Sequence, residues 1–138
     1  MKLDIFLKLY DQKKKAMLHD EYLKERIKSI YLPIEKKQKL AEDIVSISFW
    51  KDVDGRRELH IDSVKKYIAT CVAIFSEYSD VEISYEKDLV ENFNKLNMRG
   101  LFDSMIHVID QRELKELNMV IQMVTDDFMT NELNHNNV

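Results

Sequence analysis

The side chains that most often do chemistry are scattered along this chain. Its four histidines, His19, His60, His107 and His135, include no pair at i, i+3 or i, i+4 spacing, and no HExxH or Cys/His zinc pattern occurs. The sequence therefore predicts no metal site. Asp52-Val53-Asp54-Gly55 is faintly similar to the start of a calcium loop, but the later acidic ligands are missing, and a turn is the better interpretation.

Catalytic and cofactor patterns are also missing from the sequence. Glu42-Asp43 and Asp126-Asp127 are adjacent pairs, and neighbours on a helix point about 100° apart, so neither makes an acid/base pair by itself. The two glycines, Gly55 and Gly100, are too far apart to form a phosphate loop. We predict no catalytic residue, no bound cofactor and no enzymatic activity.

The single cysteine, Cys71, lies in the most apolar stretch of the chain and is expected to be a small core residue. It excludes an intrachain disulfide and favours a reducing compartment. No signal-peptide pattern precedes it, and no apolar run approaches the roughly 20 residues of a membrane span. We expect a soluble, intracellular protein without membrane contact.

The element that must organise such a chain is the stretch 62–79, which is apolar on nearly all sides from Tyr67 onward. A helix of that kind has to be surrounded by other elements. Scarce Gly and Pro favour helices throughout. The predicted fold is an all-α single domain, residues 1–132, with about five to six helices around this central helix and a disordered tail at 133–138. Asp62 is expected to cap the first turn of this helix, and the expected core positions are Ile68, Val72 and Phe75.

Three other segments have patterns that predict local structure. Residues 1–31 contain no breaker and predict one long N-terminal helix, about 40 Å if continuous, that partly projects from the domain. In 45–61, alternating residues flank Asp54-Gly55, so a small β-hairpin competes with a helix end followed by a polar loop. Asp110 and Glu113 have the spacing of a capping box before the last helix.

Charge is distributed unevenly. Residues 1–40 carry a balance of +5 and residues 41–138 a balance of −9. Such a split can steer head-to-tail association of identical subunits or docking on a charged partner, although two solvated faces of opposite sign would look the same. The basic clusters are small and lack interleaved aromatic residues, so nucleic-acid binding is not expected.

The remaining function class is protein–protein interaction. The candidate surface combines the apolar and basic parts of the N-terminal helix with an acidic flank. Its members are Leu3, Phe6, Leu7, Tyr10, Lys13, Lys14, Lys15, Glu82, Glu86 and Glu91. The expected partners are a second copy of the chain, a larger protein, or both.

The order of features from Tyr31 onward carries a resemblance. The features are Tyr31-Leu-Pro33-Ile-Glu-Lys36-Lys37, then Tyr78 with Val81-Glu82-Ile83, then Gly100-Leu101-Phe102, Ile106, Ile109 and Glu113, and finally Met123 to Asp127 and Asn131-Glu132. Over residues 31–132 the chain resembles small helical proteins from the structural gene clusters of tailed bacteriophages of Gram-positive bacteria.

That resemblance implies a role in virion assembly. The protein would be a head–tail junction component, and then part of the virion, or a chaperone that holds the tail tape-measure protein in the host cytoplasm. The resemblance supplies no catalytic residue. The alternative that the residues leave open is a phage-borne inhibitor, which would bind a host defence or regulatory protein through the acidic surface.

Overall fold

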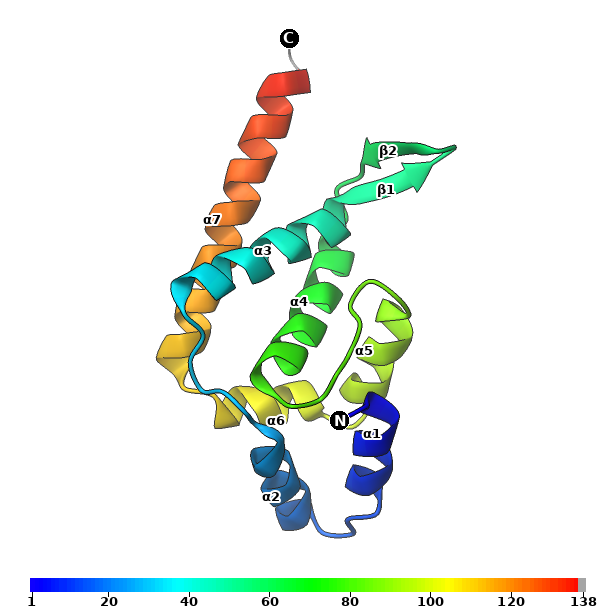
Figure 1. The fold of residues 1–138 in the computed structure, drawn as a ribbon, viewed down its shortest axis with the longest axis vertical. Helices are drawn as coiled ribbons and strands as arrows, with labels where there is room; N and C mark the ends of the chain where they lie inside the picture. Colours follow the sequence, from blue (N-terminus) through cyan, green and yellow to red (C-terminus); the bar gives the residue numbers. More distant parts are fainter. Residues whose placement is uncertain (137–138) are drawn as a thin grey trace.

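A computed structural model describes residues 1–136 of the chain, and side chains up to residue 132. Within this range it has seven helices and one two-stranded hairpin (Figure 1). The elements are α1 (Leu3–Asp11), α2 (Ala16–Arg26), α3 (Ile34–Phe49), β1 (Trp50–Val53), β2 (Arg56–Leu59), α4 (Ser63–Tyr78), α5 (Leu89–Asn97), α6 (Leu101–Val108) and α7 (Gln111–Asn136). The all-helical prediction is confirmed in its coarse form, as a mostly helical single domain.

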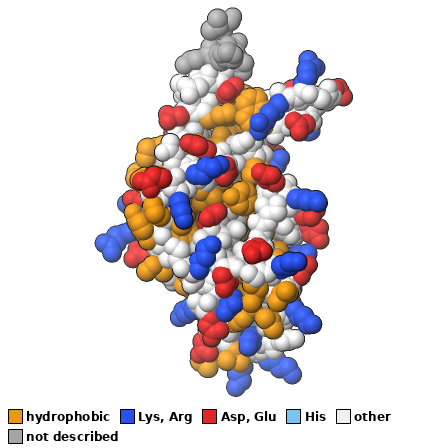
Figure 2. Space-filling model, in the orientation of Figure 1, with side chains coloured by type: hydrophobic (Ala, Val, Ile, Leu, Met, Phe, Trp, Pro, Cys, Tyr) orange, Lys and Arg blue, Asp and Glu red, His pale blue; other side chains and the backbone are white. Residues whose placement is uncertain are grey.

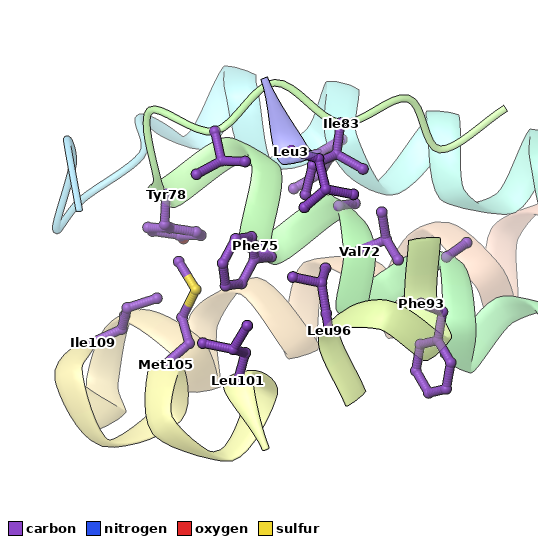
Figure 3. Close-up of a cluster of buried hydrophobic side chains, with 14 of the residues drawn as sticks. Leu3, Val72, Phe75, Tyr78, Ile83, Phe93, Leu96, Leu101, Met105 and Ile109 are labelled. Atoms are coloured by element: carbon purple, nitrogen blue, oxygen red, sulfur yellow. The ribbon is translucent and has the colours of Figure 1, made fainter. Parts of the chain in front are cut away.

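Helix α4 enters the core with its second half. Val72, Phe75 and Tyr78 are fully buried there (Figure 3), and the Asp62 carboxylate caps the first turn by accepting a hydrogen bond from Lys65 N at 2.9 Å. The prediction of a helix enclosed on nearly all sides is wrong for its first half, where Tyr67 is 58% exposed. Ile68 is half-buried and does not share the full burial of Val72 and Phe75.

The N-terminal segment is not one long projecting helix. It forms two helices, α1 and α2, which fold back on each other at the foot of the domain, joined by the polar linker 12–15 (Figure 1). The reason is burial. The Phe6 ring stacks on Tyr22 at 5.3 Å between centroids and meets Phe75 at 5.6 Å. A straight helix would bring only one of its two apolar sets to the core.

This break accounts for the count of seven helices where five to six were expected. It also ends α2 at Arg26 instead of near Tyr31, because the chain beyond it pairs with the segment after α4. Ile27 and Ser79 form an antiparallel bridge, and Lys28 N donates to Tyr78 O at 3.0 Å. The N-terminal segment is therefore part of the fold.

The β-hairpin alternative at 45–61 is confirmed. β1 and β2 pair antiparallel, with Trp50 opposite Leu59 and Val53 opposite Arg56. Asp54 and Gly55 both take positive φ, 50° and 77°, as a two-residue type I′ turn requires. The hairpin extends the α3–α4 connection away from the helices (Figure 1).

The last helix runs alongside α3 and continues beyond it. Its backbone is helical through Asn136, so the predicted disordered tail is helical at 133–136, while 137–138 lie outside the described residues. From Met129 to Asn136 the helix rises about 12 Å past the last aromatic residue that packs on α3. The upper part of α7 and the hairpin stand apart at the same end of the molecule (Figure 1).

Candidate interaction site

The prediction that the apolar residues of α1 belong to an interaction surface is wrong. Leu3, Phe6, Leu7 and Tyr10 are all buried in the core, with at most 8% of each residue exposed. They form the inner stripe of α1 and pack towards α2 and α4, so no partner can reach them in the folded chain. The hypothesis failed because it assumed a projecting helix.

The basic residues of that surface are accessible. Lys14 and Lys15 are exposed in the linker between α1 and α2, and Lys13 lies partly covered with its ammonium 5.6 Å from the centre of the Tyr22 ring. None of the three forms an ion pair within the described residues. They remain candidates for contact with another molecule.

The three predicted acidic residues are exposed but belong to different settings. Glu82 lies in the segment after α4, where its backbone N donates to Met1 O at 2.7 Å. Glu86 lies in the loop before α5, and the Glu91 carboxylate is 3.4 Å from the Lys95 ammonium one turn along α5. The structure places no dense acidic patch at these residues.

A different surface was missed by the sequence reasoning: a groove between the upper part of α7, the end of α3 and the base of the hairpin. We call it the α7 notch. Its apolar floor consists of Val45, Trp50, Val124 and Phe128, and its polar rim of Gln38, Glu42, Ser46 and Asp127. Figure 2 shows hydrophobic side chains gathered between α7 and the hairpin.

Aromatic contacts shape the α7 notch. The Phe128 ring stacks on buried Phe49 at 5.8 Å between centroids and meets the edge of Trp50 at 5.8 Å. Phe128 and Trp50 are each partly exposed. Rigid aromatic side chains in a partly open groove are typical anchors of protein interfaces.

The rim of the α7 notch is acidic. Glu42 and Asp127 are exposed, and neither forms an ion pair within the described residues. One cation lies beside the notch: Arg57 lies over the Trp50 ring at 5.2 Å and donates to Ser46 Oγ at 2.9 Å. An apolar floor with carboxylates beside it suits a partner that is both apolar and basic.

A buried ionic cluster fixes the beginning of α7 against α3 and α4. The Glu113 carboxylate accepts three hydrogen bonds: from Lys37 Nζ at 2.6 Å, Tyr78 OH at 2.6 Å and Leu32 N at 2.8 Å. We call Lys37, Glu113 and Tyr78 the Glu113 cluster. It joins α3, α7 and α4 with the segment before α3. The capping-box prediction is confirmed for Asp110, whose carboxylate accepts a hydrogen bond from Arg112 N at 2.7 Å, and wrong for Glu113, which bonds these distant groups and does not turn back to Asp110.

The cluster keeps both charges. Burial raises the pKa of Glu113, but the hydrogen bonds from Lys37, Tyr78 and Leu32 N outweigh it, so its pKa lies below the usual value. Burial lowers the pKa of Lys37, and the bonds to Glu113 and Glu116 more than reverse this effect. Since Lys37 is 0% exposed and Glu113 is satisfied by its partners, we interpret the cluster as structural.

Among the described residues, the cysteine thiol and the possible metal ligands form no catalytic or metal site. The Cys71 thiol is half-buried, and burial raises its pKa, which disfavours the reactive thiolate. Within residues 1–132, no three His, Cys, Asp or Glu side chains are grouped so that they could hold a metal ion. None of the described helices is long and apolar enough to cross a membrane.

Comparison with known proteins does not extend this picture. The chain matches no family model, no curated protein and no solved structure.

Proposed function

We propose that this chain is a non-enzymatic assembly protein that binds a partner protein in the α7 notch. The observation that carries the proposal is the notch itself, an open apolar groove with aromatic anchors between two elements that stand away from the domain. The resemblance of residues 31–132 to helical proteins of tailed-phage gene clusters supports virion assembly as the setting.

The geometry of the notch favours a helical partner. Its floor runs along α7 and α3 from Val124 and Val45 to Phe128 and Trp50, so it can receive the apolar stripe of one amphipathic helix. The Glu113 cluster fixes α7 against α3 and thereby holds the two walls of the groove in place before binding. Prepared walls reduce the ordering cost of association.

Such binding fits either role that the resemblance implies. A chaperone would hold a helical segment of the tape-measure protein in the host cytoplasm until tail assembly. A head–tail junction component would use the same groove within the virion. In both cases the partners are proteins, and nucleic acid and membrane are not required.

The test is co-expression of the tagged chain with the virion proteins encoded beside its gene, followed by affinity capture. The wild-type chain should retain one of them in a stoichiometric complex, and Phe128→Asp should lose it. Met119→Asp is the matched control, because Met119 is an exposed apolar residue nine positions before Phe128 and therefore on the opposite side of α7. Retention by Phe128→Asp, or a wild-type chain that binds neither a virion protein nor a second copy of itself, would overturn the proposal.

The inhibitor alternative has weaker support. Glu91 is paired with Lys95, and Glu86 lies in a groove that also contains Arg57 and Lys65, so the acidic residues do not form one uncompensated surface. If this alternative held, changing Glu82, Glu86 and Glu91 to Lys would abolish capture of a host protein.

A further inference from the structure

We propose that the occupant of the α7 notch is a second copy of this chain, which inserts its α1–α2 tip, residues 12–18. Copies would then associate head to tail. This inference rests on the proposed function, because it names the partner of the same groove.

The basic and apolar side chains of the tip complement the acidic rim and the apolar floor of the notch. Residues 12–18 read Gln-Lys-Lys-Lys-Ala-Met-Leu and contain no acid. Met17 is 64% exposed and Leu18 37%, next to exposed Lys14 and Lys15. The acid before the tip, Asp11, forms a bidentate pair with Arg99, with hydrogen bonds of 2.7 and 2.8 Å. The next acids along the chain, Asp20 and Glu21, lie in the second turn of α2.

The helix N-terminus in the tip is also poorly stabilised when the chain is alone. Helix α2 begins without a side-chain hydrogen bond to its first turn, has no acid in that turn, and is preceded by the three lysines. Positive charge at a helix N-terminus opposes the helix dipole. A carboxylate supplied from outside would compensate both the lysines and the free backbone N–H groups.

The notch can supply that carboxylate. Glu42 and Asp127 stand on its rim without an ion-pair partner among the described residues, beside the floor that Val124 and Phe128 provide. Helix α7 carries four acids and no Lys or Arg from Glu116 to Glu132. Apolar and acidic groups in the notch therefore match apolar and basic groups in the tip.

The two surfaces cannot meet within one molecule. The α1–α2 tip lies at the foot of the domain, and the α7 notch lies near the opposite end of its long axis, beside the hairpin (Figure 1). A contact between two copies uses one tip and one notch and leaves the other tip and notch free. Such a heterologous interface continues into a ring or a filament.

A charge-swap experiment tests this assignment. The full-length chain is compared with Lys14→Glu/Lys15→Glu, with Glu42→Lys/Asp127→Lys, with the variant carrying all four changes, and with an equimolar mixture of the two double variants. Sedimentation velocity is measured in about 20 mM and about 500 mM salt, where the screening length falls from roughly 20 Å to roughly 4 Å.

We expect the wild type to associate at low salt and to dissociate at high salt. Each double variant alone should stay monomeric, because its tip and notch then carry the same charge. The mixture and the fourfold variant should associate again, since each restores opposite charges. Lys36→Glu/Lys87→Glu, two exposed lysines outside the tip, is the matched control and should behave as the wild type.

A monomeric wild type at low salt, association of either double variant alone, or a monomeric fourfold variant would overturn the inference. These outcomes are separate from the proposed function. A monomeric chain that still captures a virion protein, with loss in Phe128→Asp, would refute the second copy as occupant and leave the notch as a binding site.

Discussion

The Glu113 cluster offers the sharpest test of how the fold is held together, through the change Lys37→Met. Lys37 Nζ lies 2.6 Å from Glu113 Oε1 and is 0% exposed, and Glu113 is 7% exposed. Methionine keeps most of the side-chain volume but removes the charge. The Glu113 carboxylate would stay buried with only Tyr78 OH and Leu32 N as donors.

We expect Lys37→Met to lower the free energy of unfolding strongly. Removing one partner of a buried ion pair costs about 3–5 kcal/mol, because the other charge remains uncompensated. The second contact of Lys37, to Glu116 at 2.9 Å, adds less than about 1 kcal/mol, since Glu116 is 44% exposed. The free energy of unfolding of a whole domain of this size is about 5–15 kcal/mol, so the loss is a large part of it.

Urea unfolding at pH 7, followed by the fluorescence of Trp50 and by circular dichroism, measures this loss. The series comprises the wild type, Lys37→Met, Glu113→Gln and the double variant, with exposed Lys36→Met as the control. The double variant should be more stable than the sum of the single losses predicts, by at least about 1 kcal/mol. A loss below about 1 kcal/mol for Lys37→Met, or strictly additive losses, would refute the reasoning.

The pH dependence gives an independent check on the same cluster. The pKa of Glu113 is lower in the folded chain than in the unfolded chain, so its contribution is present above about pH 4.3 and is lost as pH falls through the folded pKa. In Lys37→Met, burial should instead raise the pKa of Glu113. The stability difference between wild type and variant should therefore shrink between pH 7 and pH 4, and a constant difference would contradict this account.

Three further predictions concern the core, the hairpin turn and alkaline pH. Phe75→Ala should cost about 3–5 kcal/mol and Tyr67→Ala clearly less, because Phe75 is 0% and Tyr67 58% exposed; equal losses in urea unfolding would contradict this. Gly55→Ala should cost about 1 kcal/mol, since an L-residue is strained at φ 77°; an unchanged or higher melting temperature would contradict it. The pKa of Lys37 and of Tyr78 is raised by folding, so stability should fall above about pH 10; thermal melts of Tyr78→Phe should show a smaller fall.

Local chemistry was readable from the sequence. The alternation around Asp54-Gly55 made a hairpin one of two alternatives for 45–61, and the position of Asp62 before the helix indicated a cap. Both depend on residues within a few positions of each other, and the structure has both. Such features can be predicted because short-range geometry decides them.

What could not be predicted depends on contacts between distant residues. No residue type in the linker 12–15 forces a break, and the turn there results from Phe6 meeting Tyr22 and Phe75. Glu113 has the spacing of a capping residue, but its partners lie 35 to 81 positions away. The α7 notch joins Trp50 with Phe128, so neither residue alone indicated a site.

The most direct test of the proposed function is the affinity of the chain for the virion protein that we propose as its partner. Isothermal titration calorimetry would compare the wild type with Phe128→Asp, Asp127→Lys and Met119→Asp, after circular dichroism has shown that each variant is folded. An aromatic anchor at the centre of an interface contributes about 2 kcal/mol or more, so Phe128→Asp should raise Kd at least about 30-fold. Asp127→Lys should weaken binding without changing the packing, and Met119→Asp should leave Kd within about twofold. Wild-type affinity in both notch variants, or an equal loss in Met119→Asp, would contradict binding in the α7 notch.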